Sequence, residues 1–456
     1  MISSWRWPLA GFIVGSLVGA TMLTVNAVGA FVGDRGAAAP AGIETGFDEI
    51  LHTSPALVPV GRPVDLVYEL VCPPRTDEPE PSCSPSGSVH IRAAGEQDFA
   101  DVSLVADEGR LTASVPDRYT LAHGFDYYAD IDDGRGGAES LPASGREAPQ
   151  HVWTVSSDAV VDLGSHEFGG PRPPDAVVAK AAWGRDHGQV GLISGREQAL
   201  IGPSAFDVGN DGSVVVLDQV NHRLVVLDRG TSAREFAIPF AGGEGDLVFS
   251  DYGPIYVLDD GGAETPTPYV RSFDGSGRLI AATPLAEPVA DMLRMGPRGP
   301  LVHTYPSELW FPTGGTPPLS PIEQAGLGRP AREVEDGLAV VVRAGPDAAR
   351  FALVRDEQVV QSWLVKSATS LGEVQLAEPY GDGLLVVLRI WTEDQAEFQV
   401  LRLLPSGLGE GFSVDRAEWA ESASLSRFRL HGDTLYQLRS NPAGIEVAAY
   451  KIGGKR

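Results

Sequence analysis

The stretch that most constrains the fold of this chain is residues 202–228, GPSAFDVGNDGSVVVLDQVNHRLVVLD. An Asp-Gly pair at 211–212 separates its first two apolar runs, where a tight hairpin needs a positive backbone φ. A polar interval at 219–223 separates the second run from the third. The pattern predicts antiparallel strands joined by short turns. One small sheet cannot bury both of its faces alone, so further copies should follow along the chain.

The same stretch closely resembles an NHL repeat, in which Asp-Gly forms a turn, an Asp ends the next strand and Asn-His-Arg precedes the last one. The matching residues are Pro203, Asp211, Gly212, Asp218, Asn221, His222, Arg223 and Asp228. A second copy retains only IYVLD at 255–259 and VRSFD at 270–274. The resemblance implies a six-bladed β-propeller, a fold used mostly for protein or ligand binding and less often for catalysis. It also implies that these residues, His222 included, are structural.

Paired apolar strands recur along residues 176–456, which we assign to the propeller. The repeats are spaced by about 40 to 50 residues, as four-stranded blades are. They begin near Gly245, Val289, Gly337, Val374 and Ser426. The count is six blades, with seven as the alternative because 288–314 is irregular and Pro-rich. Since a strand-like segment precedes the first blade, we expect it to complete the last blade and close the ring.

Residues 41–145 predict a separate β-sandwich. Their strands are brief and separated by turn signals, and 64–71 alternates cleanly between apolar and polar positions. On strand count the segment resembles an immunoglobulin-like or fibronectin type III module. Residues 146–175 are rich in Pro and Gly and predict a semi-stiff linker. Within it, 153–163 has the pattern of one more strand for either domain.

Residues 1–40 predict a membrane anchor and a spacer. No charged residue lies between Arg6 and Asp34, and this apolar run is long enough to cross a bilayer. A signal anchor is favoured, and a cleaved signal peptide is the alternative. Because Arg6 belongs on the cytoplasmic side, both domains are expected outside, at the cell envelope, or secreted if the segment is cleaved.

The only cysteines, Cys72 and Cys83, flank a Pro-rich acidic loop. An even number of cysteines in an exported chain predicts a disulfide, which would contribute roughly 3 kcal/mol by closing this loop. Two thiols alone do not complete a tetrahedral zinc shell, and their spacing is far from Cys-x-x-Cys. We therefore interpret the pair as structural.

The net charge and the absence of known metal-site motifs exclude several classes of function. A formal net charge of −26 argues against nucleic acid, which is bound by clustered Lys and Arg. No HExxH or paired-His spacing occurs. We predict no cofactor, with Ca²⁺ as the alternative because carboxylates from several blades could supply its oxygen ligands. The carboxylates expected near the central channel are Asp246, Asp291, Glu335 or Asp336, and Glu373.

Two functions follow from this sequence. The preferred one is a non-enzymatic extracytoplasmic binding or scaffold protein, whose propeller face recognises a protein, peptide or glycan and whose only membrane contact is the N-terminal helix. The alternative is a metal-dependent propeller hydrolase or lyase with a Ca²⁺ or Zn²⁺ site in the central channel. Tryptophan anchors are common at binding surfaces. The aromatic residues expected to form such a surface are Trp310, Phe311, Trp391 and Trp419.

Overall fold

The computed structural model describes the two domains but not the N-terminal segment. It covers residues 47–453 apart from 48, 53, 73–83, 108, 122, 135–136, 143–144, 148, 196–197, 229–232, 241–244, 251–252, 260–266, 286–288, 297–298, 306–308, 314–327, 331–336, 344, 356–357 and 421–426. The predicted membrane anchor and Cys83 therefore lie outside the described residues. In the part that is covered, no helix is both long enough and apolar enough to cross a bilayer.

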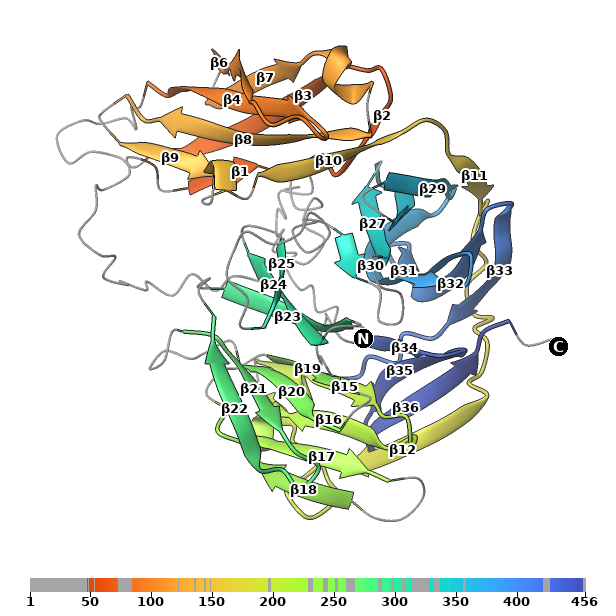
Figure 1. Cartoon of the computed structure of the whole chain (residues 1–456). Helices are drawn as coiled ribbons and strands as arrows, with labels where there is room; N and C mark the ends of the chain where they lie inside the picture. Colours follow the sequence, from red (N-terminus) through yellow and green to blue (C-terminus); the bar gives the residue numbers. More distant parts are fainter. Residues whose placement is uncertain are drawn as a thin grey trace, which may run out of the picture.

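The N-terminal domain consists of two β-sheets that share one core (Figure 1). The first sheet has the order β1-β3-β7-β6, and the second has the order β2-β10-β8-β4-β5 with β9 paired to β8. Side chains from both sheets meet between them, among them Leu66, Tyr68, Val89 and Tyr127. The strands are β1 (Glu49–His52), β2 (Leu57–Pro59), β3 (Val64–Val71), β4 (Ser86–Ala93), β5 (Ala100–Ser103), β6 (Val105–Asp107), β7 (Arg110–Val115), β8 (Gly124–Asp132), β9 (Ala138–Leu141) and β10 (Gln150–Val155).

The first domain extends further along the chain than the sequence predicts. Strand β10 pairs with β2 on one side and β8 on the other, so it lies inside the second sheet and not in a linker. Its run QHVWTV is almost entirely buried. The Pro- and Gly-rich segments on either side of β10 led to the prediction of a linker, because such a composition is typical of one.

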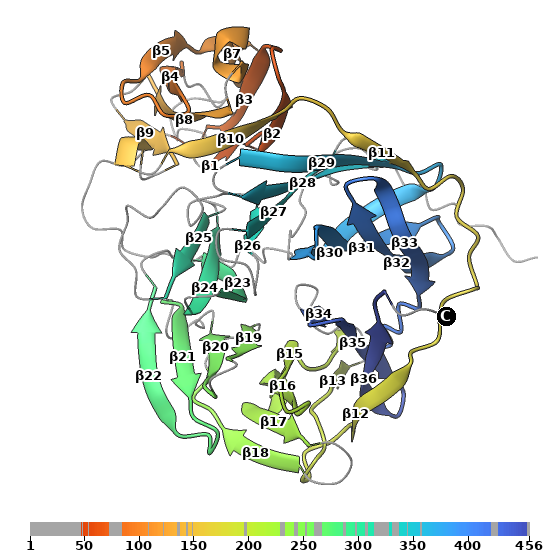
Figure 2. The ribbon, with the colours of Figure 1, turned by 45° about the vertical axis from the view of Figure 1, so that its right-hand side comes forward.

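The C-terminal domain is a ring of six sheets, which we number as blades 1 to 6 (Figure 2). Blade 1 has β15 (Ala205–Val208), β16 (Val214–Asp218), β17 (Arg223–Leu227) and β18 (Ala233–Ala237); blade 2 has β19 (Gly245–Phe249), β20 (Ile255–Asp259), β21 (Tyr269–Phe273) and β22 (Leu279–Pro284); blade 3 has β23 (Val289–Gly296), β24 (Gly299–Tyr305) and β25 (Leu309–Pro312). Blade 4 has β26 (Gly328–Pro330), β27 (Gly337–Arg343), β28 (Ala348–Arg355), β29 (Gln358–Lys366) and β11 (Ala159–Asp162); blade 5 has β30 (Ser370–Tyr380), β31 (Gly383–Trp391), β32 (Ala396–Leu404) and β33 (Gly407–Val414); blade 6 has β34 (Phe428–His431), β35 (Thr434–Asn441), β36 (Gly444–Lys451) and β12 (Ala176–Ala182).

The ring closes as expected from the sequence. Strand β12 comes before blade 1 in the chain but pairs antiparallel with β36, the last strand of the chain. This pairing confirms the prediction that the first strand of the propeller completes the last blade. A short hairpin, β13 (Ile193–Gly195) and β14 (Gln198–Ile201), lies between β12 and blade 1.

The connection between the domains is itself part of the propeller. Strand β11 pairs parallel with β29 and forms the outermost strand of blade 4. Trp153 and Val155 of β10 pack with Val340, Ala352 and Val354 of the same blade in one buried apolar cluster. The predicted extra strand within 153–163 is thus two strands, one for each domain, and both domains meet at blade 4.

Candidate binding site

The polar turn between β16 and β17 is built around a buried carboxylate. Asp218 ends β16, and a 3-10 turn, η3 (Gln219–Asn221), follows it. Oxygen Oδ1 accepts hydrogen bonds from the main-chain N–H groups of Gly191 and Asn221. Oxygen Oδ2 accepts from the Asn221 side chain and from Arg223 Nε. A fully buried charge needs such partners, and here four donors surround it.

The same turn fastens the connection that closes the ring. Arg223 donates to the main-chain oxygens of Arg185, Asp186 and Gln189, and to the carboxylate of Glu235 at 2.8 Å. Asn221 donates to the Gly184 oxygen at 3.0 Å. All of the main-chain acceptors lie in 184–189, between β12 of blade 6 and the hairpin before blade 1. Asn221 and Arg223 of the Asn-His-Arg motif therefore hold the ring-closing segment against blade 1.

The other motif residues lie at the ends of the strands. Gly212 has a φ of 79°, which confirms that the Asp-Gly pair forms a tight turn with a positive φ. Asp211 accepts hydrogen bonds from the Ser213 hydroxyl and main chain, and these bonds hold its pKa below the ordinary value. Pro203 is buried just before β15, and Asp228 lies 3.3 Å from Arg234.

His222 occupies the left-handed region, with a φ of 51°, and is exposed. Its Nδ1 lies 3.1 Å from the main-chain oxygen of Phe240. Because a carbonyl only accepts hydrogen bonds, Nδ1 carries the proton of the neutral ring, and Nε2 keeps its lone pair. This nitrogen is able to accept a hydrogen bond from a ligand.

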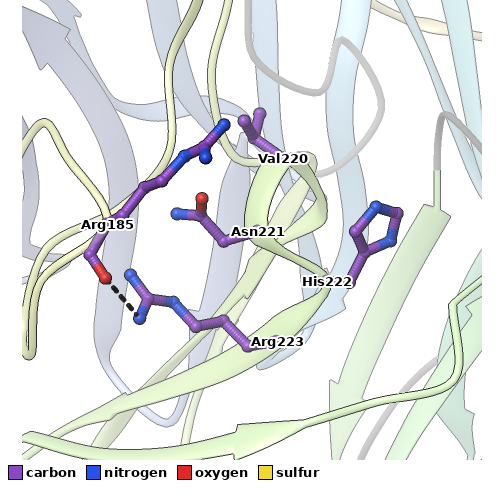
Figure 3. A pocket seen from close by; sticks show the side chains of 5 residues that line it. All are labelled: Arg185, Val220, Asn221, His222 and Arg223. Atoms are coloured by element: carbon purple, nitrogen blue, oxygen red, sulfur yellow. Dashed lines mark hydrogen bonds between the residues drawn. The ribbon is translucent and has the colours of Figure 1, made fainter.

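A shallow pocket of about 510 Å³ lies beside this turn (Figure 3). The described residues of its lining supply two guanidinium groups, an imidazole, an amide and an apolar side chain, and none of these residues carries a carboxylate. The residues are Arg185, Val220, Asn221, His222 and Arg223. Within the described part of the chain, Arg185 takes part in a single hydrogen bond, which its main-chain oxygen accepts from Arg223. Its exposed guanidinium therefore lines the pocket without a protein partner among these residues.

Two tryptophans lie on the same face of the propeller as the pocket. Trp183 and Trp419 have ring centroids 6.0 Å apart, and Trp183 Nε1 donates to the Asn441 oxygen. A Cβ atom on Gly202 would come within 3.1 Å of the Trp183 ring, so glycine allows the ring to lie close to the chain. Gln219 of the η3 turn donates to the Gly202 oxygen. This bond joins the tryptophan pair to the turn, and we call the face that carries both the seam face.

The aromatic residues proposed from the sequence lie in different environments. Trp310 is 1% exposed and belongs to the interior of blade 3, because it packs beside His303. Trp391 is half-buried, and the side chain of Phe311 lies outside the described set. Trp419 is 39% exposed. Its partner Trp183 was missed, because no sequence pattern distinguishes a tryptophan in this connection from a core residue.

The inner strands of five blades place charged side chains around the axis of the ring. Arg429 of blade 6 donates to Asp246 of blade 2 at 2.7 Å and to the Phe206 oxygen of blade 1 at 2.9 Å. Arg294 of blade 3 pairs with Glu378 of blade 5. Burial lowers the pKa of Arg294, and Glu378 opposes this effect. The Arg429–Asp246 and Arg294–Glu378 pairs reach across the ring and connect blades that are not neighbours, whereas the bond to Phe206 joins the adjacent blades 6 and 1.

Two aspartates on the inner strands repeat one hydrogen-bonding pattern. Asp207 accepts from the N–H of Val208 in its own blade and of Phe249 in blade 2. Asp246 accepts from the N–H of Leu247 in its own blade and of Leu293 in blade 3. Each carboxylate therefore binds the inner strand of its own blade to that of the next blade.

The carboxylates proposed as metal ligands do not form a common site in the described structure. Asp246 is engaged as above, Asp291 lies 2.6 Å from His303 Nδ1, and Glu373 lies 3.5 Å from Arg389. Glu335 and Asp336 are outside the described residues. Among the residues described, no three His, Cys, Asp or Glu side chains are grouped closely enough to hold a metal ion. Arginine and main-chain donors already bind the carboxylate oxygens of Asp246.

The fold and this site define an all-β protein with a propeller and a second β-domain. No protein-family model and no curated protein sequence matches the chain. Similar solved structures include virginiamycin B lyase from Staphylococcus aureus, with 10% identity over 55% of this chain and 95% of that one and a TM-score of 0.35. The Dos1 propeller has 11% identity over 63% and 95%, with a TM-score of 0.29. An auxiliary nutrient binding protein from Bacteroides thetaiotaomicron has 12% identity over 88% and 97%, with a TM-score of 0.29. Identities and TM-scores this low say nothing about activity.

Proposed function

We propose that this chain is a non-enzymatic binding or scaffold protein that recognises its ligand on the seam face of the propeller. The observation that carries the proposal is the juxtaposition of the Trp183–Trp419 pair with a pocket that contains an unpartnered guanidinium. Partly exposed tryptophans are frequent anchors in binding interfaces. The ligand classes consistent with such a surface are a protein, a peptide or a glycan.

A metal-dependent hydrolase or lyase is less well supported. Its motivation was a group of carboxylates around the channel, and in the structure Asp207 and Asp246 each bind the main chain of two blades. A carboxylate that holds the ring together is poorly placed to exchange ligands during a reaction. The binding proposal therefore takes precedence.

The proposal extends to the rest of the chain. We infer that the first domain is an immunoglobulin-like or fibronectin III-like sandwich, that 202–228 is an NHL-type repeat, and that Cys72 and Cys83 form a disulfide. Residues 1–40 anchor the protein in the membrane with both domains outside the cytoplasm. Because the sandwich shares a buried cluster with blade 4, it positions the propeller relative to the membrane and is not a loose tether. Protease added to intact cells should digest both domains, and full protection would contradict this orientation.

The binding proposal is tested with the full-length protein on peptide and glycan arrays. Replacing Trp419 by Ala should remove most of the binding to whichever class is retained. The control is Leu408→Ala on β33, which removes a side chain of similar exposure, 44%, from another blade. Equal binding by both variants, or the release of cleaved products from the retained ligand, would contradict the proposal.

A further inference from the structure

We propose that the pocket on the seam face binds the C-terminal carboxylate of a peptide, with Arg185 as the group that recognises it. This inference rests on the proposed binding function and specifies its ligand. It starts from the electrostatics of the pocket. The chain has a net charge of −26, yet the lining residues that the structure describes include two arginines and no acidic residue.

Two acidic groups near the pocket, Asp218 and Glu235, are already neutralised, whereas the exposed Asp186, next to Arg185 in the chain, makes its described hydrogen bonds through main-chain atoms alone. Asp218 is fully buried and accepts four hydrogen bonds. Glu235 binds Arg223, the N–H of Gly188 and the His187 ring. An incoming anion therefore meets no unpaired carboxylate among the lining residues, and an exposed cation remains to attract it.

The two arginines of the pocket play different parts. The Arg223 side chain donates to the carboxylates of Asp218 and Glu235 and to three main-chain oxygens, so few of its N–H groups remain for a ligand. Arg185 spends none of its side-chain donors within the described structure. A guanidinium presents two parallel N–H groups that match the two oxygens of a carboxylate. Arg185 is thus the natural carboxylate ligand.

A hydrogen-bond acceptor favours a peptide over other acids. Asn221 uses its amide nitrogen on Gly184 and Asp218, and no described residue donates to its Oδ1. The last residue of a peptide offers a carboxylate and a main-chain N–H close together. This combination suits a site with one cation and one neutral acceptor, the Asn221 oxygen.

The tryptophan pair provides the apolar part of the site. Trp183 is two residues before Arg185 in the chain, and its ring lies against Gly202. The side chain of Gln219, in the η3 turn, donates a hydrogen bond to the Gly202 oxygen. The Arg185 and Asn221 side chains both line the pocket, and in Figure 3 the His222 ring lies on the other side of the turn from them. A peptide whose carboxylate binds Arg185 can place an apolar side chain against Trp419, which is partly exposed.

The test uses the full-length protein and two libraries of N-acetylated tetrapeptides, one with free C-terminal carboxylates and one with C-terminal amides. Fluorescence anisotropy should show that the acids bind and that the amides bind at least tenfold more weakly. Arg185→Gln should reduce the affinity for the acids to that for the amides. Its melting temperature should not change, since the replaced side chain has no described partner.

Two control variants separate charge from packing. Arg234→Gln removes an exposed arginine from β18, where it pairs with Asp228, and should keep the preference for acids. Trp419→Ala should weaken acids and amides by the same factor. Equal affinity for acids and amides, an Arg185→Gln protein that binds like the wild type, or no binding of either library would overturn the inference. If glycans alone bind, and do so through Trp419, the proposed function stands and this inference fails.

Discussion

The axis of the propeller and its seam face use arginine in opposite ways. At the axis, Arg429 and Arg294 are buried, and each binds a carboxylate from another blade. On the seam face Arg223 is similarly occupied, but Arg185 beside it is exposed and has no side-chain partner among the described residues. A buried cation must be paired, because leaving it unpaired costs several kcal/mol. The comparison teaches that buried charges link the blades of this ring, whereas the charge to which we assign ligand recognition, Arg185, has no side-chain partner among the described residues.

The strongest way to test this comparison is to remove a carboxylate at the axis. Asp246→Ala leaves Arg429 buried without its ion-pair partner and removes the acceptor of two main-chain N–H groups. Breaking a buried pair in this way costs about 3 to 5 kcal/mol. We expect a large drop in the melting temperature of the variant, measured by circular dichroism in the presence and absence of EDTA.

The control for this variant is Asp246→Asn, which keeps one acceptor oxygen and almost the same shape. It should be destabilised less than Asp246→Ala. If Asp246→Ala melts like the wild-type protein, the carboxylate is not a structural link between blades. If the wild type alone loses stability in EDTA and Asp246→Ala does not, Asp246 is a metal ligand after all.

A smaller effect is expected where the charge lies at the edge of a blade. Arg223 and Arg271 each bind an aspartate that ends the second strand of a blade, Asp218 in blade 1 and Asp259 in blade 2. Only Arg223 also holds the segment that closes the ring. We therefore expect Arg223→Ala to cost about 2 to 4 kcal/mol and Arg271→Ala about half as much. The loss for Arg223 stays well below the sum of its hydrogen bonds, because the exposed acceptors regain water and Asp218 keeps three other donors.

Urea denaturation of both variants measures this difference. Limited proteolysis adds a second reading, since cleavage within 184–191 should accelerate in Arg223→Ala and stay unchanged in Arg271→Ala. Equal losses of stability with no new cleavage would mean that the motif contributes to its own blade and not to closure of the ring.

Much of this architecture could be predicted from the sequence, because it depends on local patterns. Strand alternation located Val64–Val71, and the Asp-Gly pair located the turn whose Gly212 has a positive φ. The spacing of apolar pairs gave the starts of the later blades to within a few residues, as at Gly245 and Val289. The closure of the ring was predicted from an extra strand before blade 1 that could complete the last blade. The strand, the turn and the blade starts depend on residues close together in the chain, and the closure of the ring depends on one long-range strand pairing.

The charged network at the axis could not be predicted in the same way. Asp246 was recognised as an inner carboxylate, but its partner Arg429 is 183 residues away. Nothing around FRLH at 428–431 marks that arginine as buried. The sequence could not show that Asp246 is paired, because this carboxylate and its cation come from distant blades. Arg185 was missed for the opposite reason, since an exposed arginine in a loop has no sequence signature of its own.

The smallest loss of stability is expected in a comparison of two aspartates on either side of strand β16. Asp218 at one end is buried, and Asp211 at the other end caps an exposed turn. The hydrogen bonds from Ser213 lower the pKa of Asp211 below its ordinary value of 3.8. A lowered pKa in the folded state means that Asp211 contributes its stabilisation above about pH 4, and that this contribution is lost as the pH falls through the folded-state pKa.

We therefore expect Asp211→Ala to cost only about 0.5 to 1 kcal/mol at pH 7, the net contribution of an exposed hydrogen-bonded turn. The difference between this variant and the wild type should shrink as the pH falls below 4, because both then lack the charged acceptor. Urea titrations at a series of pH values measure that difference. A gap that stays constant down to pH 2 would show that Asp211 stabilises the turn through its shape, in which case Asp211→Asn should match the wild type at every pH.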